Sequence, residues 1–306
     1  MTKVLLATEK PFAPAAVADI KKVVIEAGFD LVLLEKYKDQ SDLVKAVADV
    51  EAIIIRSDLV TREVIEAAKK LKIVVRAGAG YDNIDLPAAT EHGVVAMNTP
   101  GQNSNAVAEL AFGMMIYHAR KFFSGASGTE LKDKSIGIHA YGNVGKCVAR
   151  IAKGFSMKVY AFDPFVKKEE IVADGVFFTN SAAELYSKCQ YVSLHIPANA
   201  STKKSINYDL LSTMPNGAVL VNTARKEVID EDGLLKIFAS RKDFSYLSDI
   251  EPDCLAALEA EYKGRFYCTP KKAGAQTEEA NVNAGIAAAR QIVGFILRGD
   301  ATYKVN

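Results

Sequence analysis

Polar side chains that could carry out chemistry follow several short apolar runs of this sequence. Arg225, Glu251 and Lys271 each come shortly after such a run. An arginine can bind a carboxylate through two parallel hydrogen bonds and polarise the oxygen beside it. A basic side chain with a carboxylate partner can donate or accept a proton. Together these residue types could hold a small acid and move one proton on it, which is what a protein must supply when a nicotinamide transfers hydride.

Further polar segments stand at the ends of predicted strands. A lone charged residue in such a loop is more often a solvated surface residue. In open parallel sheets, however, ligands bind beyond the carboxyl ends of the strands, so several such segments together indicate a shared cleft. The segments are Arg56-Ser57, Arg76 to Gly80, His195 to Pro197, Asn222 to Arg225, Asp249 to Pro252 and Thr269 to Lys271.

Residues 135–163 have the pattern of a strand, a turn, a helix and a second strand that ends in Asp163. Such a unit binds a dinucleotide, because the N-terminus of its helix favours the pyrophosphate. Gly142 would let backbone N–H groups approach the anion, and Gly145 would let the helix pack closely on the sheet. Asp163 lies about 20 residues after Gly142, where a carboxylate can accept hydrogen bonds from the adenosine ribose. Ala140 stands where the first glycine of the fingerprint is expected, and we expect its methyl group to be tolerated.

The composition is that of an ordinary soluble protein. The chain has 306 residues, 49% of them hydrophobic, and a formal net charge of +1. This length allows one large or two ordinary domains, and the absence of a basic excess speaks against nucleic acid as a partner. No signal peptide is expected, and no apolar stretch is expected to reach the roughly 20 residues that span a bilayer. The four cysteines have no metal-like spacing, so we expect free thiols, no metal and a cytoplasmic location.

Strand and helix patterns alternate along the chain, which predicts an α/β fold with parallel sheets covered on both faces. The predicted strands are 3–7, 30–34, 51–55, 72–75, 94–97, 136–139, 157–162, 176–178, 191–194, 218–221, 244–249 and 266–268. The predicted helices are 15–27, 43–50, 61–70, 85–92, 104–121, 143–153, 181–187, 208–214, 230–240 and 277–297.

Over nearly its whole length the chain resembles the D-2-hydroxyacid dehydrogenase family, and most closely its D-3-phosphoglycerate dehydrogenase branch. The segments that carry the resemblance are R-A-G-A-G-Y-D-N-I-D from Arg76, N-T-P-G-Q-N-S-N-A-V-A-E-L from Asn98, G-T-E-L from Gly128, N-T-A-R ending at Arg225, and T-E-E-A-N from Thr277. The resemblance implies two flavodoxin- or Rossmann-like doubly wound domains, with the cofactor domain inserted into the substrate domain. The substrate domain would comprise residues 1–98 and 274–306, and the NAD-binding domain residues 99–273. It also implies a homodimer joined through the cofactor domains.

The resemblance also assigns roles to individual residues. The implied NAD-binding residues are Gly142, Asn143, Val144, Gly145, Asp163, His195, Pro197, Thr223 and Asp249, the last of them near the nicotinamide carboxamide. The implied substrate-binding residues are Arg56, placed for a phosphate group, together with Ser57, Gly78, Ala79 and Gly80, whose loop would hold the carboxylate. Arg225 would bind the substrate carboxylate, and Glu251 would support the general acid or base.

The sequence departs from the family at the general acid or base itself. A histidine is expected after Thr-Pro, where this chain has Lys271 and then Lys272 as a second candidate. A protonated amine can give a proton to a keto oxygen, whereas oxidation of an alcohol needs the neutral amine, and a free lysine has a pKa of about 10.4. We therefore expect Lys271 to replace the histidine, with oxidation favoured at alkaline pH. The alternative is that Lys271 is a surface residue of a site that has lost its acid.

The resemblance therefore implies an NAD-dependent enzyme that oxidises D-3-phosphoglycerate to 3-phosphohydroxypyruvate in serine biosynthesis. Asp163 favours NAD because its carboxylate would repel a 2′-phosphate. A reductase for glyoxylate, hydroxypyruvate or another 2-keto acid is the alternative within the class. An NAD(H)-sensing binding protein with an impaired active site is the alternative from another class, and Lys226, which follows Arg225 where a glycine is usual, also favours it. The partners expected are a small 2-hydroxy or 2-keto acid and a second copy of the chain, with neither nucleic acid nor a membrane. No C-terminal regulatory domain is expected, because the sequence ends at Asn306.

Overall fold

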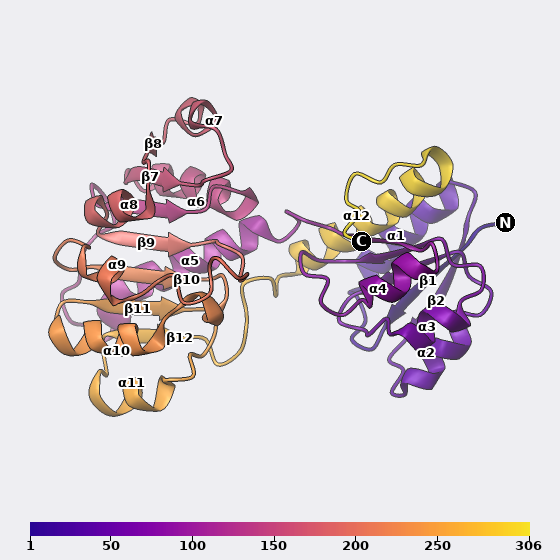
Figure 1. The fold of residues 1–306 in the computed structure, drawn as a ribbon, viewed down its shortest axis with the longest axis horizontal. Coiled ribbons are helices and arrows are strands. Elements are labelled where there is room, and N and C mark those ends of the chain that lie inside the picture. The colour runs from indigo at the N-terminus through magenta and orange to yellow at the C-terminus, as the bar shows by residue number, and fades with distance from the viewer. The chain divides into compact units, whose positions relative to one another are not determined.

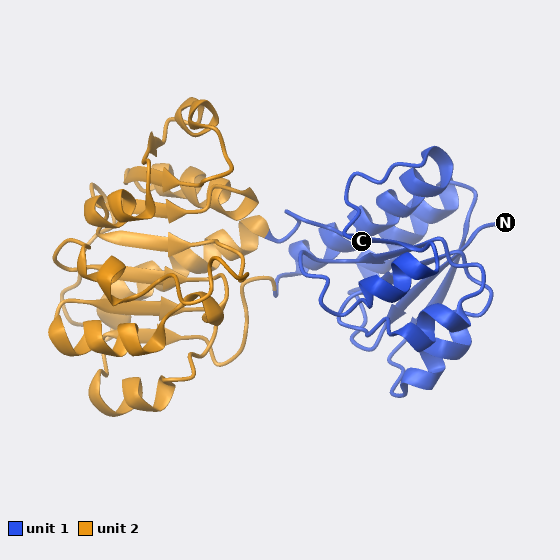
Figure 2. Ribbon diagram, viewed as in Figure 1, with its two compact units in different colours: residues 1–103, 276–306 blue, residues 104–275 orange.

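The computed structural model describes all 306 residues and divides them into two compact units. Unit 1 consists of Met1–Asn103 and Gln276–Asn306, and unit 2 of Ser104–Ala275 (Figure 2). The chain therefore leaves unit 1, builds all of unit 2 and returns. The predicted fold class, two doubly wound parallel-sheet domains with one inserted into the other, is confirmed.

Unit 1 is built on a five-stranded parallel sheet in the order β2-β1-β3-β4-β5 (Figure 1). Its strands are β1 (Lys3–Thr8), β2 (Asp30–Glu35), β3 (Ala52–Ile55), β4 (Ile73–Arg76) and β5 (Val95–Asn98). Its helices are α1 (Pro14–Glu26), α2 (Gln40–Ala46), α3 (Arg62–Ala67), α4 (Leu86–Glu91) and α12 (Glu278–Arg298). The central strands β1 and β3 are continuous apolar runs and are buried on both faces, as parallel strands between helix layers must be.

Helix α12 returns the chain to unit 1 and packs against α1 and the sheet. Its N-cap Thr277 accepts a hydrogen bond from the Ala280 N–H, and Gly299 ends it in the left-handed conformation. Its 21 residues are long and apolar enough, by length and composition alone, to cross a membrane. The expectation that no segment reaches this length is therefore wrong for α12. The buried face of α12, which includes Ala288 and Ile292, belongs to the core of unit 1, and small residues there permit close packing.

Unit 2 is built on a seven-stranded parallel sheet in the order β12-β11-β10-β9-β6-β7-β8. Its strands are β6 (Ser135–His139), β7 (Lys158–Phe162), β8 (Phe177–Phe178), β9 (Tyr191–Leu194), β10 (Val219–Asn222), β11 (Ser245–Ser248) and β12 (Phe266–Cys268). Its helices are α5 (Ser104–Ala119), α6 (Asn143–Gly154), α7 (Lys168–Ala173), α8 (Ala182–Lys188), α9 (Tyr208–Ser212), α10 (Glu231–Ser240) and α11 (Leu255–Glu261), with short 3₁₀ turns η1 (Lys121–Phe123) and η2 (Lys226–Val228). The sequence patterns miss only α7, α11 and the two 3₁₀ turns.

The order of strands reverses between β6 and β9, which pair with each other and lead to opposite halves of the sheet. At such a switch point the loops after the strands diverge and leave a crevice. In Figure 1 the arrows of β9, β10 and β11 point the same way, so the loops that follow them lie at one edge. This edge carries the polar residues predicted for the cofactor and for the chemistry.

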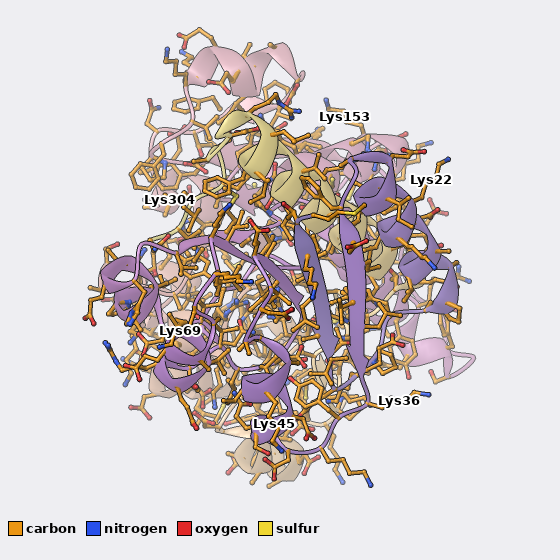
Figure 3. The ribbon with its side chains drawn as sticks, turned by 90° about the vertical axis from the view of Figure 1, so that its right-hand side faces the viewer. Lys22, Lys36, Lys45, Lys69, Lys153 and Lys304 are labelled. Atoms are coloured by element: carbon orange, nitrogen blue, oxygen red, sulfur yellow. The ribbon has the colours of Figure 1, made fainter.

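The lysines labelled on unit 1 point outward. In Figure 3, Lys22 on α1, Lys36 after β2, Lys45 on α2 and Lys69 after α3 lie around the rim of this unit. They are spread around the rim in this view rather than gathered on one element.

Candidate active site

The turn between β6 and α6 leaves room for an anion. Helix α6 begins at Asn143, and no side chain caps its N-terminus, so its first N–H groups lack intrahelical acceptors. A Cβ atom added at Gly142 would meet nothing within 4 Å. The space beside Gly142 is therefore open, and this open space, the cradle, lies at the positive end of a 12-residue helix. This fits a pyrophosphate, as the sequence predicts.

Gly145 has a different reason to be glycine. A Cβ atom there would lie 2.4 Å from the carbonyl oxygen of Ala140 and 3.0 Å from Cγ2 of Ile138. These contacts are with the backbone and side chain of β6 and the turn that follows it. Gly145 is thus required by the packing of α6 on the sheet, as expected.

Ala140 adopts the left-handed conformation, with φ of 78°. The sequence-based expectation considered only the volume of its methyl group, whereas the backbone conformation carries the cost. A left-handed conformation costs an L-residue about 1–2 kcal/mol, and glycine would avoid it.

Replacing Ala140 by glycine is expected to stabilise the protein, because glycine removes this strain while losing more chain entropy on folding. The net gain should be about 0.5–1 kcal/mol in the free energy of unfolding. Denaturant unfolding of the two proteins measures it. A loss of stability in the glycine variant would contradict the strained conformation of Ala140.

Asp163 follows β7 and lies at the predicted ribose position. Its Oδ2 accepts the N–H of Tyr141 at 2.7 Å, and its Oδ1 accepts those of Phe165 at 2.8 Å and Val166 at 3.3 Å. Three backbone donors therefore fix the carboxylate against the pyrophosphate turn. Each carboxylate oxygen has two acceptor positions, so Oδ1 is fully used and one position on Oδ2 remains for a ribose hydroxyl.

Two histidines, the buried His139 and the half-buried His195, flank the switch point. His139 ends β6 and contacts the hydroxyl of Tyr186 through Nδ1 at 3.2 Å. His195 follows β9; its Nδ1 lies 3.4 Å from Thr223 Oγ1, while its Nε2 is buried without a partner. Burial lowers the pKa of His139 to about 4, and burial together with His139 lowers that of His195 to about 3. Both rings are therefore neutral at physiological pH, and His195 and Thr223 lie together as predicted.

These histidines predict acid sensitivity. Burial and Lys121 also lower the pKa of His118, to about 4. The unfolded chain takes up these protons near pH 6.5, whereas the folded chain stays neutral until about pH 4. The stability is therefore complete above pH 6.5 and is lost as the pH falls towards 4. Urea unfolding at pH 7 and pH 5 should differ by about 2 kcal/mol for each histidine.

A variant that lacks one of the three histidines shows how much of the stability lost at acidic pH comes from that residue. His118→Asn should remove about 2 kcal/mol of the difference between pH 7 and pH 5. Equal unfolding free energies at the two pH values in the parent protein would contradict neutral, buried imidazoles.

Arg225 lies in the loop after β10 and is half-buried, and the side chain of Asn222 binds the backbone of this loop. The amide of Asn222 donates to the Arg225 carbonyl at 3.1 Å and accepts the Ala224 N–H at 3.0 Å. The Arg225 side chain makes one hydrogen bond, from Nη1 to the Ala224 carbonyl at 3.0 Å. Its remaining donors are available, so the loop presents a guanidinium at the carboxyl edge of the sheet.

Lys226 has a structural explanation. Its Nζ lies 2.5 Å from Oδ1 of Asp253, on the loop after β11. The pair links the Arg225 loop to the Glu251 loop at the exposed surface, where solvent and salt screen an ion pair and leave it weak. The lysine after Arg225 is therefore compatible with an intact loop.

Glu251 and Lys271 both follow strands at this edge, but no ion pair within 4 Å joins them. Both side chains are exposed, as is Lys272. Glu251 instead lies near Cys268, whose pKa is raised by burial and by the charges of Glu251 and Glu259. The expected contact between lysine and glutamate is absent here because both charges are well solvated and gain little by pairing.

Asp249 is almost fully buried, and its carboxylate accepts three bonds from the loop after β12. The donors are the Thr269 hydroxyl at 3.0 Å, the Ala273 N–H at 2.7 Å and the Gly274 N–H at 2.8 Å. The structure thus shows Asp249 fastening the loop that carries Lys271. Its predicted contact with the nicotinamide carboxamide stays a prediction.

In unit 1, Arg56 follows β3, and its guanidinium is largely engaged by the chain. It donates to Asn281 Oδ1 at 2.6 Å and to the carbonyls of Lys10 and Pro11 at 3.2 and 3.3 Å. Its guanidinium carbon also lies 4.9 Å from the ring centre of Phe12. Ser57, beside it, is exposed. Arg56 therefore joins α12 to the sheet of unit 1, a role that the sequence did not indicate.

The loop of Gly78, Ala79 and Gly80 follows β4. The N–H groups of Ala79 and Gly80 make no hydrogen bond within the chain, which suits the binding of a carboxylate. Asn98 holds the loop by donating to the Ala79 carbonyl at 2.6 Å. A Cβ atom at Gly78 would lie 1.7 Å from Nη1 of Arg76, so the guanidinium of Arg76 lies against this glycine. Sequence reasoning assigned no role to Asn98 or Arg76, although both come at strand ends.

A family model of the NAD-binding domain of D-isomer specific 2-hydroxyacid dehydrogenases matches residues 104–257. A D-3-phosphoglycerate dehydrogenase of Methanocaldococcus jannaschii is 34% identical over 286 residues, which cover 87% of this chain and 53% of that protein. The chain belongs to the D-2-hydroxyacid dehydrogenase family. The predicted cofactor, NAD, is confirmed by this membership and by an NAD⁺-bound relative.

Two further relatives of this dehydrogenase family bear on its substrate. A crystal structure of NAD⁺-bound 3-phosphoglycerate dehydrogenase from Entamoeba histolytica is 46% identical, covers 100% of this chain and 98% of that one, and superposes with a TM-score of 0.86. A hydroxypyruvate reductase of Thermotoga maritima is 34% identical over 235 residues, 72% of this chain and 76% of that protein. The chain spans about half the length of the Methanocaldococcus jannaschii relative.

Proposed function

We propose that the protein is an NAD-dependent dehydrogenase that interconverts D-3-phosphoglycerate and 3-phosphohydroxypyruvate, in serine biosynthesis. The observation that carries this proposal is the 46% identity, over the whole chain, to a 3-phosphoglycerate dehydrogenase solved with NAD⁺. The open cradle at Gly142 and the oriented carboxylate of Asp163 support the cofactor part of it.

Each proposed role follows from the geometry of its loop. NAD bound at the α6 turn supplies the hydride acceptor or donor. Arg225 binds the substrate carboxylate through the guanidinium donors that the chain leaves unused. The N–H groups of Ala79 and Gly80 bind a carboxylate oxygen, and Arg56 with Ser57 contributes positive charge and a hydroxyl for the phosphate.

Lys271 gives or takes the proton at the oxygen of the reacting carbon, and Glu251 keeps the local charge favourable for it. In reduction, Lys271 begins protonated and ends neutral. Both side chains are exposed and unpaired in this structure, so neither is committed to another partner. Lys272 is the alternative for the same role.

Paired variants of the two lysines test this assignment. Lys271→Ala is expected to lower kcat for reduction by about 10²- to 10⁴-fold, because a general acid contributes a factor of that size. Lys272→Ala serves as the matched control and should retain turnover. Full turnover by the Lys271 variant would remove Lys271 from the mechanism, and loss only in the Lys272 variant would transfer the role.

A reductase for unphosphorylated 2-keto acids is the second candidate, supported by the relative named hydroxypyruvate reductase. The engagement of Arg56 by Asn281 and two carbonyls favours it further, because fewer guanidinium donors remain for a phosphate. Comparing kcat/KM for 3-phosphohydroxypyruvate, hydroxypyruvate and glyoxylate decides between the two. A higher value for either unphosphorylated acid would sink the phosphoglycerate proposal and leave the dehydrogenase class intact.

We also propose that the protein acts in the cytoplasm as a homodimer through unit 2. Phe123 is 65% exposed, and its N–H donates to the carbonyl of Arg120, which lines a cavity of about 270 Å³ together with apolar residues such as Ile116 and Phe155. An exposed aromatic side chain near a partly apolar hollow suits an interface. The four free cysteines suit a reducing compartment. Sedimentation equilibrium showing a monomer at micromolar concentration would contradict the dimer.

A further inference from the structure

Three polar side chains lie in the otherwise apolar core between β10 and β11. They are Asn222 at the end of β10 and Tyr246 and Ser248 on β11, and their exposed fractions are 0%, 1% and 1%. β10 and β11 pair in parallel, with Asn222 opposite Ser248. Burial of such groups is costly unless each hydrogen-bonding atom finds a partner.

The hydrogen bonds of Asn222 are complete. One amide hydrogen goes to the Arg225 carbonyl at 3.1 Å and the other to the Tyr246 hydroxyl at 3.2 Å. The amide oxygen accepts the Ala224 N–H at 3.0 Å. Asn222 therefore fixes the backbone on either side of the Arg225 position and is itself held by Tyr246.

The other half of the chain of bonds runs to the loop after β11. The Tyr246 hydroxyl donates to Ser248 Oγ at 3.3 Å, and Ser248 Oγ donates to the Ile250 carbonyl at 2.7 Å. Ser248 Oγ also accepts the Ile250 N–H at 3.2 Å. Ile250 immediately precedes Glu251, so these bonds end at the loop of the proposed acid-base partner.

The Ser248 hydroxyl has a second, longer acceptor, the Asn222 backbone carbonyl at 3.3 Å. The Tyr246 hydroxyl accepts from the Asn222 amide and donates to Ser248, so it joins the side chain that holds the Arg225 loop to the side chain that holds the Glu251 loop. An apolar pair in the same volume would cost the sheet little stability or none. The stability of the sheet therefore does not require the network, and its effect is on the positions of the two loops at its ends.

We propose that Tyr246 is a positioning residue, whose hydroxyl holds the loop of Arg225 in register with the loop of Glu251. This inference rests on the proposed function, because it assigns Tyr246 to the same reaction. The Lys226–Asp253 ion pair joins the same two loops at the surface. Of these two connections between the loops, the ion pair is exposed to solvent, whereas the hydrogen bonds of the network are buried and are not weakened by solvent.

Tyr246→Phe removes only the linking oxygen. We expect kcat/KM for the preferred 2-keto acid to fall about ten-fold or more, since small misplacements of binding groups are costly. The dissociation constant for NADH, measured by fluorescence, should change less than kcat/KM does, because the α6 turn is not part of the network and only Thr223 of the implied NAD-binding residues lies in the loosened loops. Hydrogen exchange of the backbone amides in residues 223–228 and 250–254 should become faster in both loops.

Tyr191→Phe is the matched control, because Tyr191 is a buried tyrosine on the adjacent strand β9 and takes no part in the network. It should leave all three readouts near the parent values. Unchanged kcat/KM and unchanged exchange in Tyr246→Phe would overturn the proposal, as would an equal loss of NADH binding. If the parent protein turns over no acid, the proposed function fails, while faster exchange in both loops would still show the coupling.

Discussion

Replacing Arg225 by lysine is expected to lower kcat/KM for a 2-keto acid by about 10²-fold or more. Lysine keeps the positive charge but cannot form the two parallel bonds of a guanidinium with a carboxylate. The protein should remain folded, because the Arg225 side chain makes only one bond, to its neighbour's carbonyl. Steady-state kinetics with NADH and the acid measures the loss.

The conservative variant Arg150→Lys provides the control for Arg225. Arg150 is an exposed arginine of unit 2 on α6 that donates to Asn105, and it should retain parent kinetics. Most of the Arg225 effect should appear in KM, with NADH affinity unchanged. Parent-like kcat/KM in Arg225→Lys would show that the substrate carboxylate is bound elsewhere.

A side chain added at Gly142 should weaken NADH binding, whereas one added at Gly145 should lower the stability of the fold. Gly142→Val should weaken NADH binding by about 100-fold or more, which is about 2.8 kcal/mol, because its side chain enters the cradle of the pyrophosphate. Its thermal stability should stay near that of the parent, since a Cβ there meets nothing within 4 Å. NADH fluorescence titration and thermal unfolding measure the two effects.

Gly145→Ala tests the packing of the same turn. Its Cβ would lie 2.4 Å from the Ala140 carbonyl, so the helix must shift, at a cost of about 1–3 kcal/mol in stability. If Gly142→Val destabilised the fold and Gly145→Ala did not, the described turn would be wrong. If Gly142→Val bound NADH as the parent does, the cofactor would lie elsewhere.

The cofactor half of the site was largely predictable because its signals are local. A strand, a glycine turn, a helix and a strand ending in Asp163 lie within 29 residues, and short-range patterns of this kind specify their own geometry. The parallel sheets followed from the alternation of apolar runs and helical patterns. The doubly wound arrangement and the insertion of one domain into the other followed from the family resemblance rather than from periodicity.

The less predictable features depend on contacts between distant residues. Arg56 donates to Asn281, and no spacing in the sequence connects these positions. Asp249 holds the loop after β12 because β11 and β12 are neighbours in the sheet. The left-handed conformation of Ala140 could not be predicted either, because alanine rarely adopts it and the residue type gives no sign of it.

The most direct test of the account follows the absorbance of the reduced nicotinamide while NADH is mixed with the protein and a 2-keto acid. The account predicts NADH oxidation that depends on the acid, is fastest with 3-phosphohydroxypyruvate and is largely lost in Arg225→Lys. Tight NADH binding without turnover of 3-phosphohydroxypyruvate, hydroxypyruvate or glyoxylate would contradict a dehydrogenase and favour a protein that senses the dinucleotide.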